Sequence, residues 1–130
     1  MTSRVNTPLK LSDDGMTVHV TGPILAWEAD ERSAVFSVEI TQPPNGARVS
    51  ARGRSTRTYH PNDKKWQAVA RVTGPKPLEL GPALATATAT ITLENGETEP
   101  YVWPVPVVLV HNLARAHDPS DAAQAITADG

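Results

Sequence analysis

The feature that most constrains the fold is a strict alternation of apolar and polar residues along several short segments. It is clearest at residues 84–93, LATATATITL, where threonines alternate with alanine, isoleucine and leucine. Successive side chains of a β-strand point to opposite faces of a sheet. This pattern therefore predicts a strand with one face in the core and the other in water. The same period recurs at residues 34–41 and 66–72, so the chain is expected to be all-β.

The segments between the predicted strands have the composition of turns. Asn95 and Gly96 both tolerate a positive φ, so they predict a two-residue type I′ turn and a hairpin into residues 98–110. Residues 73–82, TGPKPLELGP, are too long for a tight hairpin and predict a crossover from one sheet to another. Twelve prolines and eight glycines in 130 residues favour short strands over long helices.

Six to seven short strands with one crossover predict an antiparallel β-sandwich of immunoglobulin-like or fibronectin-III-like type. We place this domain at residues 13–113. Residues 1–12 show no periodic pattern and are expected to form a flexible N-terminal arm. Residues 114–130 are expected to form a C-terminal tail, in which a short helix would form only if it docked on the domain.

Charge is divided unevenly along the chain. The net charge is −2, but residues 48–71 carry seven basic side chains and one acid, a local charge of +6 against −8 elsewhere. Guanidinium groups bind carboxylates and phosphates in a bidentate manner, so this segment is a candidate site for an anionic partner. The alternative is a solvated sheet face in which the arginines pair across strands with acids such as Glu39. The candidate binding residues are Arg48, Arg52, Arg54, Arg57, Lys64 and Lys65.

Residues 101–110, YVWPVPVVLV, are apolar on both faces of the predicted strand. Pro104 and Pro106 are two residues apart, so the N–H donors that they lack would point to the same lateral edge. We therefore expect a strand at a sheet edge or at a kink, with its second face covered by the chain itself or by another subunit. The candidate interface residues are Tyr101, Val102, Trp103, Pro104, Pro106 and Val108.

The tryptophans Trp27, Trp66 and Trp103 fit either a sugar-stacking platform or core anchors. Trp66 and Trp103 continue the apolar faces of their strands, which favours the core. The four histidines have no metal-binding spacing, there is no cysteine, and no nucleophile elbow or phosphate-binding glycine loop is present. We therefore predict no catalytic residue, no metal ligand and no cofactor.

These observations favour a non-enzymatic interaction or structural module, a subunit or adaptor in a bacterial or phage multi-protein assembly. It would bind a protein partner or a second copy, for example through contact of the Arg48–Arg57 face with the hairpin tip at residues 94–99. The alternative is a small ligand-binding domain or small enzyme that takes an anionic metabolite or carbohydrate at Arg52, Arg54, Trp66 and His60.

The sequence also bears on where the protein acts. Residues 1–16 have no apolar signal core, and the run at 101–110 is about half the ~20 residues of a membrane span. We expect a cytoplasmic protein or a virion component and no membrane contact. Nucleic acid is disfavoured because no aromatic residues interleave with Arg48–Arg54 to stack on bases.

Overall fold

A computed structural model describes residues 1–44 and 48–112 of the chain. The described residues form eight strands and no helix: β1 (Thr2–Ser3), β2 (Leu9–Leu11), β3 (Thr17–Ala26), β4 (Glu31–Gln42), β5 (Val49–Arg54), β6 (Lys65–Val72), β7 (Gly81–Leu93) and β8 (Thr98–His111).

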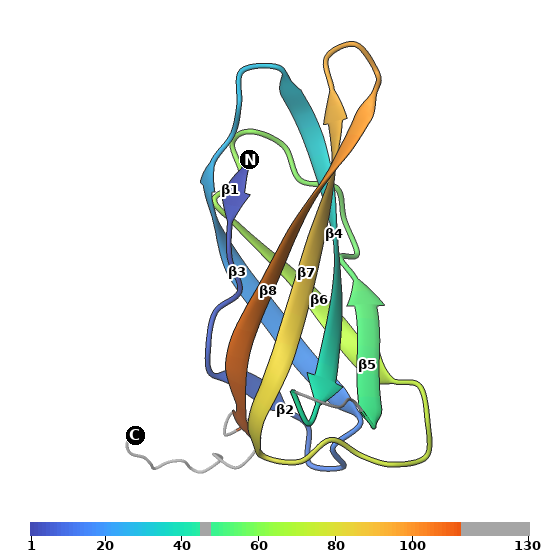
Figure 1. The fold of residues 1–130 in the computed structure, drawn as a ribbon. Coiled ribbons are helices and arrows are strands. Elements are labelled where there is room, and N and C mark those ends of the chain that lie inside the picture. Colours follow the sequence, from blue (N-terminus) through green and yellow to red (C-terminus); the bar gives the residue numbers. More distant parts are fainter. Residues whose placement is uncertain (45–47, 113–130) are drawn as a thin grey trace, which may run out of the picture.

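Seven of the strands close into a β-barrel in the order β3-β2-β8-β7-β4-β5-β6, and β6 pairs back onto β3 (Figure 1). The all-β prediction is confirmed, but the predicted open β-sandwich is wrong. Residues 17–23 of β3 pair with 65–71 of β6, and β2 pairs in parallel with β8, so no separate second sheet exists among the described strands. Alternation specifies which face of a strand is buried, and a sandwich and a barrel satisfy it equally well.

The interior is built from the apolar face of each strand, as the alternation predicts. Phe36 of β4 stacks on Trp66 of β6 with ring centroids 4.5 Å apart, and Tyr59 meets the Phe36 ring edge-on at 5.6 Å. On the other side of Phe36, its direct cross-strand partner on β7 is Ala89. Small side chains thus lie beside large ones, an arrangement that suits the narrow interior of a small barrel. The buried row on β7 consists of Ala83, Ala85, Ala87, Ala89 and Ile91.

Residues 1–12 are part of the barrel and not an arm outside it. β1 and β2 both pair with β3, and the N–H of Asn6 between them donates to the carbonyl of Thr21 at 2.9 Å. The buried residues of this segment are Met1, Ser3, Val5, Leu9 and Leu11. All five are odd-numbered, but the polar Ser3 and the exposed Thr7 interrupt the apolar alternation, and for that reason the sequence pattern did not reveal the strands. The predicted tail at 114–130 lies outside the described residues.

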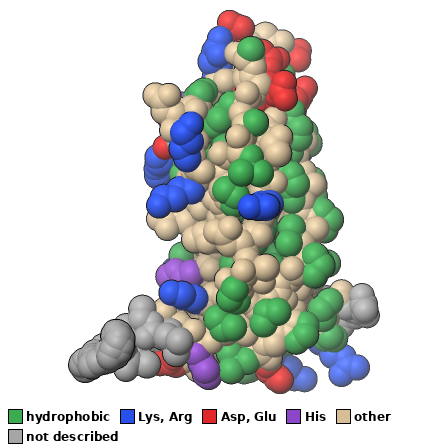
Figure 2. All heavy atoms as spheres, turned by 90° about the vertical axis from the view of Figure 1, so that its left-hand side faces the viewer, with side chains coloured by type: hydrophobic (Ala, Val, Ile, Leu, Met, Phe, Trp, Pro, Cys, Tyr) green, Lys and Arg blue, Asp and Glu red, His purple; other side chains and the backbone are tan. Residues whose placement is uncertain are grey.

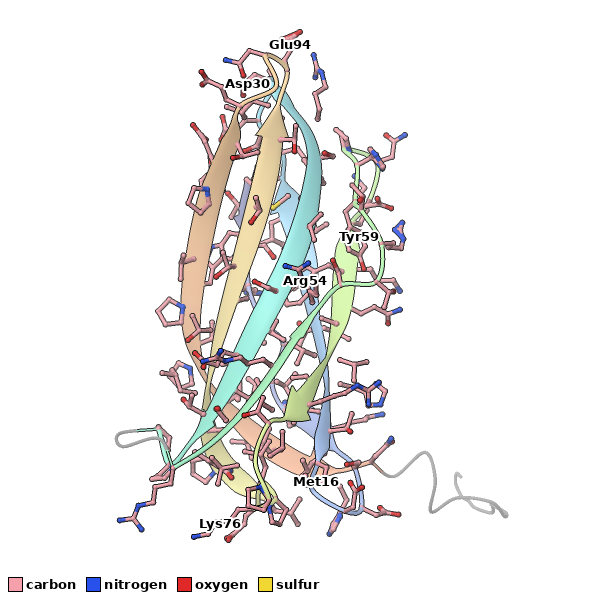
Figure 3. The ribbon with its side chains drawn as sticks, turned by 90° about the vertical axis from the view of Figure 1, so that its right-hand side faces the viewer. Met16, Asp30, Arg54, Tyr59, Lys76 and Glu94 are labelled. Carbon is pink, nitrogen blue, oxygen red and sulfur yellow. The ribbon has the colours of Figure 1, made fainter. Side chains whose placement is uncertain are left out.

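The long connection between β6 and β7 crosses one end of the barrel, here called the lower end (Figure 1). It passes the ends of β5 and β4, which lie between β6 and β7 in the sheet, and its own residue Leu78 is buried. The predicted crossover therefore exists, but it joins two strands of one closed sheet. Figure 3 labels Met16 and Lys76 at this lower end, and Asp30 and Glu94 at the opposite, upper end.

The β7–β8 hairpin ends in a three-residue loop, and not in the predicted two-residue turn. The N–H of Gly96 donates to the carbonyl of Leu93 at 2.9 Å, and the N–H of Leu93 donates to the carbonyl of Glu97 at 2.8 Å. Gly96 follows the turn with φ at 88°, a left-handed conformation that favours glycine. This is the common turn-plus-bulge form of a hairpin, in which one glycine suffices.

Candidate functional site: an apolar strip on β8

The two apolar faces of β8 have different surroundings. Val107 and Leu109 are buried in the barrel, and Tyr101, Trp103 and Val105 are half-buried behind them. The opposite face points outward, where the side chain of Val102 is 56% exposed and that of Val108 is 46% exposed. We call the exposed outward residues Val102, Pro104, Pro106 and Val108 the β8 strip. Of the six predicted interface residues these four face solvent, whereas Tyr101 and Trp103 face inward and stack on each other at 6.1 Å.

The edge predicted from the prolines is confirmed. β8 pairs with β7 over residues 98–109, but β2 pairs with β8 only over residues 109–111. Before residue 109, no described strand pairs with the other side of β8. The N–H of Val108 donates across this gap to Oγ1 of Thr7 at 3.1 Å, which shows that the even-numbered N–H groups face the gap. Pro104 and Pro106 therefore remove donors from the unpaired edge.

A buried charge pair lies near the upper end of the gap beside β8. The terminal ammonium of Met1 is 2.7 Å from Oε2 of Glu31, and both side chains are fully buried. The other carboxylate oxygen of Glu31 accepts the N–H of Glu28 at 2.8 Å. Burial, followed by the nearby carboxylates of Glu31 and Glu99, raises the pKa of Tyr101 above its usual value. Every group of this cluster is satisfied within the fold, so we interpret the cluster as structural.

Arg52 and Arg54 of β5 are exposed on the outer wall of the barrel, where Figure 3 labels Arg54. The Nε of Arg52 donates to Oε2 of Glu39 at 3.1 Å, the cross-strand pair that the alternative interpretation predicted. Arg52 and Arg54 border a shallow depression of about 400 Å³, which Thr86 and Thr88 of β7 also line. The Arg52 side chain is 69% exposed, so its ion pair is a weak one.

Arg57 belongs to the loop after β5 and is engaged within that loop. Its Nη2 donates to Oδ1 of Asp63 at 2.9 Å, and its guanidinium carbon lies 4.4 Å from the ring centroid of Tyr59. The pKa of Asp63 is lowered, first by the N–H of His60 and then by the Arg57 charge, with burial opposing both. Arg57 therefore holds the loop in place.

The six predicted anion-binding residues do not form one site. Arg52 and Arg54 lie on the barrel wall, Arg57 is held in its loop, and Arg48 lies at the lower end. The remaining two, Lys64 and Lys65, border a separate depression of about 530 Å³ beside β3. The charge of +6 belongs to one continuous segment of the sequence, and the barrel distributes the side chains that carry it over several surfaces.

The alternative ligand site is not assembled either. Trp66 is 1% exposed inside the barrel, where its Nε1 donates to Oγ of Ser3 at 2.9 Å. Arg52 and Arg54 point outward from the wall, so they cannot share a ligand with the Trp66 ring. The prediction of Trp66 as a core residue is confirmed. Trp27 is half-buried, and its Nε1 donates to the carbonyl of Asp63 at 3.2 Å.

No protein-family model and no curated protein sequence matches this chain. Among the residues that the structure describes, no group of three or more His, Asp or Glu side chains could hold a metal ion. Residues 1–44 and 48–112 also contain no helix long and apolar enough to cross a membrane. The functional interpretation therefore depends on the exposed surfaces.

Sequence reasoning missed one of these surfaces, a groove of about 640 Å³ at the lower end. Arg48 and Lys76 line it from different segments, and neither forms an ion pair with a described residue. Lys76 lies in the proline-rich crossover, and the only feature of the sequence that marks it is its position between two prolines. The groove is lined by Gln42, Pro43, Pro44, Arg48, Val49, Lys76, Pro77, Glu79, Leu80 and Pro82.

Proposed function

We propose that this chain is a non-enzymatic β-barrel module that binds another protein through the β8 strip, as a structural subunit or an adaptor. The single observation that carries the proposal is the exposure of four consecutive outward side chains of β8, all of them apolar. Figure 2 shows apolar side chains along this side of the barrel, below the acidic upper end. A contiguous apolar surface of this kind is typical of an interaction site in a water-soluble domain.

The composition of the strip supports a protein partner over a small ligand. No charged side chain interrupts residues 102–108, and depletion of charge is characteristic of the centre of protein interfaces. No residue of the strip lines any of the five described depressions, whereas small-molecule sites are concave pockets. Neighbouring β7 presents Thr86 and Thr88, whose hydroxyls can form a polar rim.

The prolines define how the partner would bind. A partner that added a strand to the unpaired edge of β8 would need backbone donors that Pro104 and Pro106 lack. We therefore infer contact with the face of the strand, through side chains, and not pairing with its edge. The absence of cysteine is compatible with the proposed setting, a bacterial or phage assembly in the cytoplasm or in a virion.

The test is site-specific photocross-linking in the cells that carry the gene. A photoreactive residue replaces Val102 in one variant, and Gln67, an exposed residue on the outer face of β6, in the control. We expect a discrete cross-linked protein product from position 102 and none from position 67. The mass of the product distinguishes a second copy from a different partner. Absence of a product at position 102, or the same product from both positions, would overturn the proposal.

A further inference from the structure

The two ends of the barrel carry complementary features, and neither belongs to the β8 strip. We infer that the β7–β8 hairpin tip of one copy docks into the lower-end groove of a second copy, which gives a head-to-tail row of barrels. The inference is independent of the proposed function, because it uses different residues at the opposite ends of the molecule.

The hairpin tip, residues 94–99, is a narrow acidic projection at the top of the barrel in Figure 1. Glu94 is anchored at its base, because its N–H donates to the carbonyl of Asp30 at 2.8 Å and its carboxylate pairs with Arg32 at 2.7 Å. Glu97 is exposed, and its carboxylate forms no ion pair with a described residue. The carboxylate of Glu99 has only a long contact of 3.5 Å with the hydroxyl of Tyr101. The tip therefore presents carboxylates that a second molecule can reach.

The groove at the other end is held in place by hydrogen bonds. The Nε2 of Gln42 donates to the carbonyls of Glu79 and Pro82, at 2.8 and 3.0 Å, and its Oε1 accepts the N–H of Glu79 at 2.8 Å. One side chain thus ties the end of β4 to the segment that forms the opposite wall. A preformed groove costs a partner less ordering on binding.

The walls and the charges of the groove suit an acidic hairpin tip. Four prolines and Leu80, which is 48% exposed, give stiff apolar walls. Arg48 and Lys76 also line an adjoining depression of about 270 Å³, so both cations lie at the border between the groove and this depression. Glu79 is the one carboxylate among the residues that line the groove. Asp14, at the same end, accepts hydrogen bonds from Ser12 and Met16 within its own turn.

The placement of the two features at opposite ends determines the kind of assembly. The surface that docks differs from the surface that receives it, so the contact is heterologous and leaves a free tip and a free groove at the two ends of every row. Because exposed charges contribute to the contact, we expect the association to weaken as salt shortens the Debye length. The β8 strip lies along the side of such a row and stays available to a partner.

A charge-swap experiment tests this inference by sedimentation velocity. The groove variant carries Arg48→Glu and Lys76→Glu, and the tip variant carries Glu97→Lys and Glu99→Lys. The control, Lys64→Glu with Lys65→Glu, changes the net charge as much as the groove variant does, but at a different surface. Wild type and control are expected to associate at about 0.01 M salt and to dissociate at about 1 M, where the Debye length is about 30 Å and 3 Å.

Each variant alone places like charges at both ends and is expected to be monomeric. An equimolar mixture restores opposite charges, because the acidic tip of the groove variant meets the basic groove of the tip variant. We expect the mixture to regain the sedimentation coefficient of the wild type, with native circular dichroism spectra for both variants. A monomeric wild type at low salt, or a mixture that stays monomeric, would overturn the inference. Val102→Lys with Val108→Lys should leave the association unchanged, which separates it from the β8 strip.

Discussion

Single residues without a side chain determine how closely the strands of this barrel approach. A Cβ atom on Gly53 of β5 would lie 1.8 Å from the carbonyl oxygen of Val69 on β6. A Cβ on Gly22 of β3 would lie 2.0 Å from the carbonyl oxygen of Arg4. Both glycines occupy positions on strands where alternation predicts an inward side chain. Alternation places Gly53 on the face opposite Arg52 and Arg54, but a close approach depends on the neighbouring strand and leaves no local signal.

We predict that Gly53→Ala destabilises the fold by about 1–3 kcal/mol, the usual cost of forcing extra volume into a packed site. The matched control is Gly74→Ala, because a Cβ on Gly74 meets nothing within 4 Å. Urea unfolding followed by tryptophan fluorescence measures both. Equal stability of the two variants would show that β5 and β6 can separate without cost.

For single residues such as the arginines, alternation predicts the face of the strand but not the contacts between loops. It placed Arg52 and Arg54 on the outer face and named Glu39 as a cross-strand partner, and both statements hold in the structure. It could not show that Arg48 precedes β5 and lines the same groove as Lys76, because that groove lies between two connections at the end of the barrel. Proximity between loops depends on the path of the chain, which has no period.

At the level of elements, β8 shows how much of a strand's surroundings its sequence can predict. Its two prolines predicted an edge, and its apolar alternate face predicted a surface that needs a cover. The short β2 supplies the only described pairing on that side, and it reaches three residues of β8. No described strand pairs with the rest of this edge, although Val108 donates to Thr7 of the N-terminal segment, and the edge is blunted by proline, a common natural defence against pairing between molecules.

We predict that Pro104→Val with Pro106→Val restores two donors to this edge and promotes strand pairing between molecules. Thioflavin fluorescence and light scattering at high salt, where the proposed end-to-end contact is screened, should both increase with time. Thr86→Val with Thr88→Val on β7 is the control, since it adds apolar β-branched residues to the same outer surface without changing the edge. Aggregation of the control alone would contradict the edge explanation.

At the level of the whole molecule, closure of the sheet is what the sequence could not predict. Two pairings create it, β3 with β6 and β2 with β8, and the second joins residues about 100 positions apart. Every strand would bury the same face in a sandwich, so alternation carries no information about closure. Closure also makes the ends of the barrel two distinct surfaces, one with the acidic tip and one with the groove, near which Figure 3 labels Glu94 and Lys76.

The N-terminal segment is held to the barrel by more than backbone pairing, because Met1 and Glu31 form a buried charge pair. Because both groups are fully buried, Glu31→Gln would leave the ammonium of Met1 without a counter-charge. The loss of one partner of a buried pair typically costs about 3–5 kcal/mol. Glu94→Gln removes one partner of the exposed Arg32 pair, whose contribution is at most about 1 kcal/mol. Urea unfolding at neutral pH should therefore show that Glu31→Gln lowers the free energy of unfolding several times more than Glu94→Gln does. If the two losses are equal, this attachment does not depend on the buried charge, and the apolar contacts of Met1 and Val5 hold the N-terminal segment against β3.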